Sequence, residues 1–205
     1  MGNEITQPAG NYYDKYRTKN PIARWLMQGF LSNFDALAKR ARTETVDAIE
    51  IGCGEGELSI RLARSGMRVM GCDIAPEAVE EARVRAAGLD VPFFECSVER
   101  AAEQFQPAGL VVCCEVLEHL NDPVSALAVL DSLSTRYVLV SVPREPLWRV
   151  LNVLRLRYIT ALGNTPGHVQ HWSRRSFTDM LSSQFDIVAV KSPLPWTMVL
   201  CRVRR

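Results

Sequence analysis

The chain has 205 residues, of which 47% are hydrophobic and 23% charged, and its formal net charge is +1. This balance is typical of one globular domain and excludes disordered, collagen-like and low-complexity classes. The mean hydropathy is −0.03, and no run of about 18 apolar residues is present, which predicts no membrane-spanning segment.

Apolar runs and amphipathic segments alternate along the middle of the chain. We expect strands at 46–51, 68–73, 93–97, 110–114 and 137–143, and helices at 57–64, 76–87 and 123–133. Strands that are almost continuously apolar and alternate with helices form a parallel sheet that is covered on both faces.

Three segments fall outside this alternation. Residues 11–42 are expected to form one or two helices with an apolar stripe of Trp25, Leu26, Phe30, Phe34 and Leu37. Residues 146–162 form an apolar helical insertion that arginines interrupt. The tail contains a helix at 173–183 and strands at 185–191 and 196–203. Four residues separate these two strands, too few for a crossover helix, so the strands must be antiparallel.

The first strand runs into the loop Glu50-Ile51-Gly52-Cys53-Gly54-Glu55-Gly56. Glycines at alternate positions let the backbone turn tightly and approach a ligand closely. The dinucleotide fingerprint requires glycine where Glu57 stands, and the acidic loop opposes a pyrophosphate, so it suits a ligand with positive charge. At the end of the second strand, Asp73 is placed to accept both hydroxyls of an adenosine ribose, and Ile74 to cover the adenine.

With the segment 114–123 and the terminal hairpin, these motifs resemble the class I S-adenosylmethionine-dependent methyltransferases over roughly residues 45–205. The resemblance implies an α/β fold: a three-layer αβα Rossmann-like sheet of seven strands, the last antiparallel. It implies one domain over 1–205, divided into a helical cover (1–44), a cofactor-binding core (45–143), an acceptor-side insertion (144–172) and a closing helix and hairpin (173–205). In the cover, Tyr12, Tyr13 and Tyr16 are expected to close over the cofactor.

The resemblance also implies S-adenosylmethionine as the cofactor. The residues expected to contact it are Glu50, Gly52, Cys53, Gly54, Gly56, Asp73, Ile74, Ser97, Val98 and Glu115. Glu50 is expected to meet the sulfonium or amino end through water, and Asp73 to hold the ribose. The family often has acids where this chain has Ser97 and Gly109, so we expect the adenine contact to rest on backbone groups.

Glu115, Glu118 and His119 follow the fourth strand and share one face if this stretch is helical. Together with His168 they resemble the metal-binding quartet of the small-RNA 3′-end 2′-O-methyltransferases, and are similar to the ubiquinone-biosynthesis O-methyltransferases. A divalent metal on these four residues would lower the pKa of an acceptor hydroxyl. The alternatives are metal-free catalysis, with His119 or Glu118 as general base and His168 beside them, and a purely structural role.

Charge is divided unevenly along the chain. Residues 1–135 carry a net charge of −7, and residues 136–205 carry +8. A basic third suits RNA phosphates, but its arginines are not interleaved with a row of aromatics for base stacking, so we expect no nucleic-acid partner. The apolar insertion at 146–162 indicates a partly apolar small-molecule acceptor or contact with a membrane surface.

The six cysteines lie in or beside apolar runs without zinc-finger spacing. We expect reduced core residues in a cytoplasmic protein, and the polar first residues give no signal peptide. The sequence thus predicts a methyltransferase that acts on an oxygen of a small, partly apolar acceptor. The alternatives are a metal-dependent RNA ribose 2′-O-methyltransferase and a non-catalytic cofactor-binding module.

Overall fold

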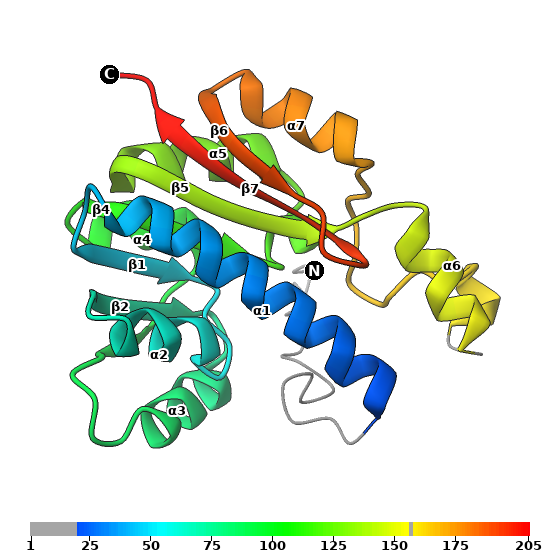
Figure 1. The fold of residues 1–205 in the computed structure, drawn as a ribbon, viewed down its shortest axis with the longest axis horizontal. Coiled ribbons are helices and arrows are strands. Elements are labelled where there is room, and N and C mark those ends of the chain that lie inside the picture. Colours follow the sequence, from blue (N-terminus) through cyan, green and yellow to red (C-terminus); the bar gives the residue numbers. More distant parts are fainter. Residues whose placement is uncertain (1–19, 156–157) are drawn as a thin grey trace, which may run out of the picture.

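A seven-stranded sheet with strand order β3-β2-β1-β4-β5-β7-β6 forms the centre of the protein (Figure 1). The computed structural model describes residues 20–155 and 158–205, so the three tyrosines expected to cover the cofactor lie outside the described residues. The strands are β1 (Asp47–Ile51), β2 (Arg68–Asp73), β3 (Phe93–Glu95), β4 (Ala108–Cys114), β5 (Ser134–Pro143), β6 (Phe185–Lys191) and β7 (Trp196–Val203). Only β7 runs against its neighbours β5 and β6, which confirms the predicted fold class.

Helices cover both faces of the sheet. One face carries α1 (Pro21–Arg42), α2 (Glu57–Arg64) and α3 (Pro76–Arg85), and the other carries α4 (Ala101–Gln104), α5 (Pro123–Leu133) and α7 (Arg174–Ser182). Successive residues of β4 alternate between the two cores: Leu110 and Val112 join the first, and Val111 and Cys113 join the second. Both faces of the strand are therefore buried, which explains its continuous apolar run.

Helix α1 crosses the front of the sheet, and its first turns lie beyond the ends toward which the parallel strands point (Figure 1). The helix begins after Asn20, whose side chain accepts hydrogen bonds from two backbone N–H groups of the first turn. Phe30 and Phe34 are buried as expected, but Trp25 is 64% exposed. Its assignment to the buried stripe is wrong because Trp25 lies about 140° around the helix from Phe30, on the face opposite the buried residues.

The insertion after β5 is less helical than expected. It contains α6 (Leu147–Leu154) and a short 3₁₀ helix, η3 (Ile159–Ala161), and it projects to the side of the sheet beyond β7 (Figure 1). The buried Asn152 side chain donates to the carbonyl of Gly163 at 2.9 Å and to the Thr165 hydroxyl at 3.2 Å. These bonds fold the second half of the insertion back onto α6.

Gly109 lies near the start of β4, at the opposite end of the sheet from the glycine loop. A Cβ there would lie 1.6 Å from the Thr45 hydroxyl. The Gly109 N–H donates to the carboxylate of Asp47 at 3.0 Å, and the Thr45 hydroxyl donates to the same oxygen at 2.9 Å. Gly109 therefore lies away from the glycine loop, in a position that its contacts with Thr45 and Asp47 fix.

All six cysteines are buried, as the sequence predicts, and none forms a disulfide in the described part of the chain. Within the described part of the chain, no helix combines the length and apolar character needed to cross a membrane.

Candidate active site

The loop between β1 and α2 turns sharply at three glycines. Gly52, Gly54 and Gly56 have φ angles of +73°, +51° and +80°, a region that residues with a Cβ avoid. The N–H groups of Gly52 and Cys53 both donate to the carbonyl of Cys72, at 2.8 and 2.9 Å. The loop is thereby held at the carboxyl ends of β1 and β2, where sheets of this kind bind ligands.

Asp73 ends β2 and faces this loop. One carboxylate oxygen accepts from the N–H of Gly54 at 2.8 Å, and the other accepts from the N–H of Ala75 at 2.9 Å. A carboxylate has about four acceptor positions, so each oxygen retains capacity for a ligand hydroxyl. The next residue, Ile74, is 43% exposed, which leaves an apolar surface beside the carboxylate.

Two further acids lie at the loop. Glu50 is buried and accepts from the Ser59 hydroxyl, and Glu55 is buried as well. Burial raises the pKa of the Cys53 thiol, and the carboxylates of Glu50 and Asp73 raise it further. The Cys53 thiol therefore stays protonated and packs against the loop, and it does not act as a nucleophile. Acidic groups around the loop favour a cationic ligand.

Ser97 and Val98 follow β3. Ser97 precedes the 3₁₀ helix η1 (Val98–Arg100), and the Val98 side chain is buried in the second core. Val98 therefore presents only its main chain to a ligand. This arrangement suits the expectation that adenine recognition rests on backbone groups.

Glu115 departs from the predicted helical face. Its φ is +60°, and the 3₁₀ helix η2 (Leu117–His119) begins only two residues later. The Glu115 carboxylate accepts from the Ser141 hydroxyl at 2.9 Å and from the Trp196 indole N–H. The expectation that Glu115 shares a face with Glu118 and His119 is therefore wrong, because contacts to β5 and β7 hold it apart.

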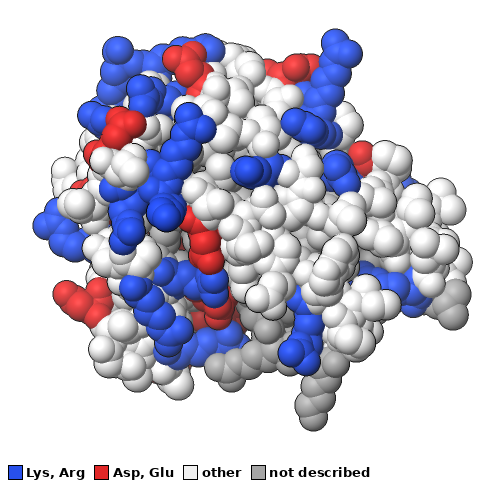
Figure 2. All heavy atoms as spheres, viewed as in Figure 1, with Lys and Arg blue, Asp and Glu red and all other residues white. Residues whose placement is uncertain are grey.

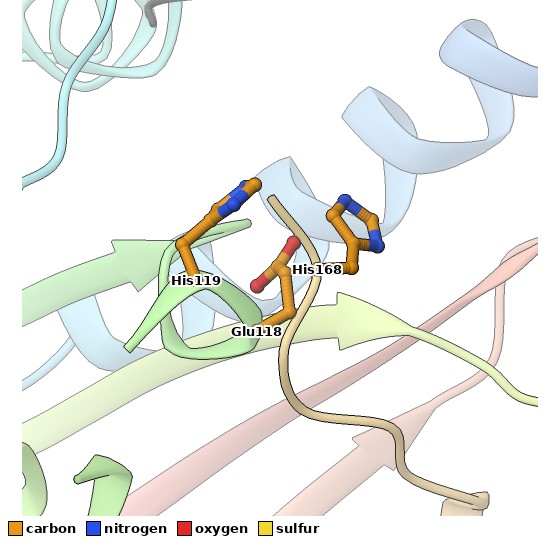
Figure 3. A group of neighbouring side chains, drawn as sticks. All are labelled: Glu118, His119 and His168. Carbon is orange, nitrogen blue, oxygen red and sulfur yellow. The ribbon is translucent and has the colours of Figure 1, made fainter. Parts of the chain in front are cut away.

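Glu118, His119 and His168 do come together (Figure 3). One potential ligand atom from each lies within 4.8 Å of the others, and Glu118 and His168 are buried. The Nδ1 atom of His119 is 3.0 Å from the carbonyl oxygen of Gly167. Because a carbonyl only accepts, Nδ1 carries the hydrogen and the lone pair of the neutral imidazole is on Nε2.

Main-chain bonds place His168 against this turn. The N–H groups of Val169 and Gln170 both donate to the carbonyl of Glu118, at 2.9 and 3.1 Å. The His168 ring lies edge-on to the ring of His119, with centroids 4.9 Å apart. The histidine from the insertion is thus held beside the turn that follows β4.

Aromatic rings that the sequence analysis did not assign to the site continue from His168. Trp148 stacks on His168 at 5.9 Å, and its indole N–H donates to Thr165. Trp196 lies 5.8 Å from Trp148, and Phe30 lies 5.1 Å from Trp196. Trp148 lies within the apolar insertion and Trp196 begins the last strand, two segments that the sequence singles out, but nothing local indicates that the two rings meet.

The sheet with one reversed strand, together with the glycine loop and Asp73 at its carboxyl edge, defines a Rossmann-like methyltransferase domain. Residues 48–134 match the family described as "Methyltransferase domain". Ubiquinone biosynthesis O-methyltransferase of Xanthomonas axonopodis pv. citri is 37% identical over 130 residues, 60% of this chain and 54% of that protein. Residues 48–134 are therefore a methyltransferase domain, and the chain spans about half the length of the curated relatives it matches.

Solved structures agree on the fold. Magnesium protoporphyrin IX methyltransferase from Synechocystis PCC 6803, with bound SAH, has a TM-score of 0.71 at 22% identity over 93% of this chain and 91% of that chain. The small RNA methyltransferase HEN1 has a TM-score of 0.66 at 16% identity, over 85% of this chain and 25% of that chain.

Proposed function

We propose that the chain transfers the methyl group of S-adenosylmethionine to an oxygen atom of a small, partly apolar acceptor. The observation that carries this proposal is the cluster of Glu118, His119 and His168 at the carboxyl end of β4. The glycine loop lies beside the same turn, because Gly52 and Val116 are in direct contact. The curated relatives, which are named as O-methyltransferases, support transfer to oxygen.

The residues of the crevice fit the methyl donor. The Asp73 carboxylate suits two ribose hydroxyls, Ile74 offers an apolar cover, and the acids of the loop suit a sulfonium or ammonium group. The bound donor supplies an electrophilic methyl carbon on a sulfur that is already a good leaving group. The chain therefore contributes mainly alignment and exclusion of water.

His119 is placed to accept the hydroxyl proton of the acceptor. The Gly167 carbonyl holds its Nδ1–H, so the Nε2 lone pair acts as the base. The buried carboxylate of Glu118 beside it favours the imidazolium that forms. His168, stacked on Trp148, forms the adjoining wall.

Apolar surface beside the cluster supports a partly apolar acceptor. The row of Phe30, Trp196 and Trp148 leads to His168. A groove of about 300 Å³ between the first half of α1 and the joint of β6 and β7 is lined by Trp25, Leu26 and Leu194 among others. The insertion also exposes apolar side chains: Val150, Val153, Leu154, Ile159 and Leu162. These side chains support contact with an apolar acceptor or with the surface of a membrane that holds it.

A metal-assisted reaction is the second candidate. Two imidazoles and one carboxylate form a donor set that divalent metals accept. Glu118, His119 and His168 would hold the ion, which would polarise the acceptor hydroxyl. Glu115 does not complete the set because Ser141 and Trp196 engage it. The fold shared with HEN1 makes the ribose of RNA the acceptor to test in this case.

The deciding experiment incubates the purified chain and labelled S-adenosylmethionine with phenols, catechols or a small RNA, each with and without EDTA. We expect a methyl group on an oxygen of a small acceptor, identified by mass spectrometry, and activity that EDTA leaves unchanged. Loss of activity in EDTA that Mn²⁺ or Mg²⁺ restores supports the metal-assisted reaction. Methylation of RNA alone contradicts the proposed acceptor, and donor binding without any transfer favours a non-catalytic module.

A further inference from the structure

A second groove lies between α1 and α2, at the end of the sheet where the parallel strands begin. Its volume is about 390 Å³, and its apolar floor includes Phe34, Ala38 and Leu62. Helix α2 starts at the glycine loop, but the groove is formed by its later part, from Arg61 to Ser65. Arg61 lies four residues, about 6 Å, along α2 from Glu57, and no residue that lines the groove belongs to the candidate active site.

The walls of this groove are strongly cationic. Lys39 and Arg42 project from α1, and Arg61 and Arg64 from α2, whereas Asp35 is the one acid among the lining residues. Figure 2 shows lysine and arginine gathered on this side of the molecule, over the C-terminal half of α1 and its surroundings, while the opposite side of the same face is mostly uncharged. The lining side chains carry a formal charge of +3.

Two of the cations are held in place. The Arg61 guanidinium bonds both carboxylate oxygens of Asp35, at 3.0 and 2.5 Å, and Arg42 donates to the carbonyl of Ser65. Lys39 and Arg64 are exposed and have no acidic partner among residues 20–155 and 158–205. One comes from each helix, so two uncompensated cations lie on opposite walls.

Helix ends alone do not account for this charge. The groove lies at the C-terminal turns of both α1 and α2, where cations complement the helix dipole. Each helix end is equivalent to about half a negative charge, so the two ends offset roughly one unit of the +3. Glu57, 3.7 Å from Arg61, offsets a further part of this charge, and what remains in the concave site is the pair of cations without an acidic partner in the described residues, Lys39 and Arg64.

We propose that this groove binds a ligand with two or more phosphate groups. Such a ligand matches the excess charge and spans both walls, and guanidinium groups bond phosphate oxygens in pairs. Lys39 and Arg64 make the principal contacts, and Arg61 and Arg42 add fixed donors at the edge. The proposal is independent of methyl transfer, because the groove shares no residue with the candidate active site.

Calorimetric titration with inorganic tripolyphosphate tests the proposal, with citrate as a non-phosphate anion. We compare the parent with Lys39→Gln/Arg64→Gln and with a control, Arg174→Gln/Lys191→Gln, that removes the same charge from α7 and the end of β6. We expect binding that weakens with salt, falls about tenfold in the first variant, and changes less than twofold in the control. Melting curves and S-adenosylmethionine binding establish that the variants are folded.

Vesicles containing a phosphoinositide distinguish a lipid headgroup from a soluble phosphate. Binding of either probe that requires Lys39 and Arg64 supports the site, and the probe that binds identifies the source. The proposal is overturned if neither probe binds, if both double variants weaken binding equally, or if citrate binds as tightly as tripolyphosphate.

Discussion

Replacing Gly52 with alanine places a methyl group where the glycine loop has no room for one. A Cβ at this position would lie 2.2 Å from Cγ2 of Val116, on a backbone with φ of +73°. The left-handed backbone costs a residue with a Cβ about 1–2 kcal/mol, and overpacking costs about 1–3 kcal/mol. We therefore expect Gly52→Ala to lower the free energy of unfolding by about 2–5 kcal/mol.

Val116→Ala separates these two contributions. Val116→Ala removes the methyl group that the new Cβ of Gly52→Ala would contact. The double variant therefore avoids the cost of overpacking, but it still carries the cost of the left-handed backbone. Urea unfolding of the four proteins forms a double-mutant cycle, in which we expect a favourable coupling of about 1–3 kcal/mol. If Gly52→Ala is as stable as the parent, or if the effects of the two substitutions are additive, the close contact between the glycine loop and the turn after β4 is refuted.

Three further predictions concern the site and the stability of the fold. Asp73→Ala removes charge-assisted hydrogen bonds and should weaken S-adenosylmethionine binding by a few kcal/mol; unchanged affinity in calorimetry contradicts this role. His119→Ala should lower turnover by about 10²–10⁴-fold and leave donor affinity unchanged, and equal turnover assigns His119 a structural role. The Tyr137 hydroxyl and then the neighbouring arginines hold the pKa of Glu44 below its ordinary value, against burial. The ionised Glu44 carboxylate therefore stabilises the folded protein at neutral pH, and this contribution is lost as the pH falls through the pKa of the folded state. Glu44→Gln should lower the melting temperature more at pH 7 than at pH 3. An equal difference at both pH values rejects this linkage.

The sequence predicts the sheet well because its signals are local. Buried parallel strands are continuous apolar runs, and the four-residue joint between β6 and β7 permits only an antiparallel pair. The exposure of Trp25 also follows from a local signal that the predicted stripe did not respect. Helical periodicity sets Trp25 about 140° around α1 from Phe30, and so outside the face that is buried.

The candidate site contains some contacts that are local in the sequence and others that depend on distant residues. Gly54 and Asp73 belong to one strand–helix–strand unit, β1–α2–β2, so their hydrogen bond follows from a motif of about 25 residues. The conformation of Glu115 depends on Ser141 and Trp196, which are 26 and 81 residues further along the chain. Helical periodicity cannot anticipate a turn that such distant partners stabilise.

The two hydrogen bonds to the Glu118 carbonyl have a consequence for engineering. The acids of the glycine loop together with Asp73 and Ile74, which suit the methyl donor, lie on β1, in the loop after it and at the end of β2, whereas His168 and Trp148 come from the insertion after β5, which is joined to the turn after β4. If the proposed function holds, exchanging this insertion for one of different shape, with the two hydrogen bonds to Glu118 kept, is expected to change which acceptor is methylated while the site for the methyl donor stays the same.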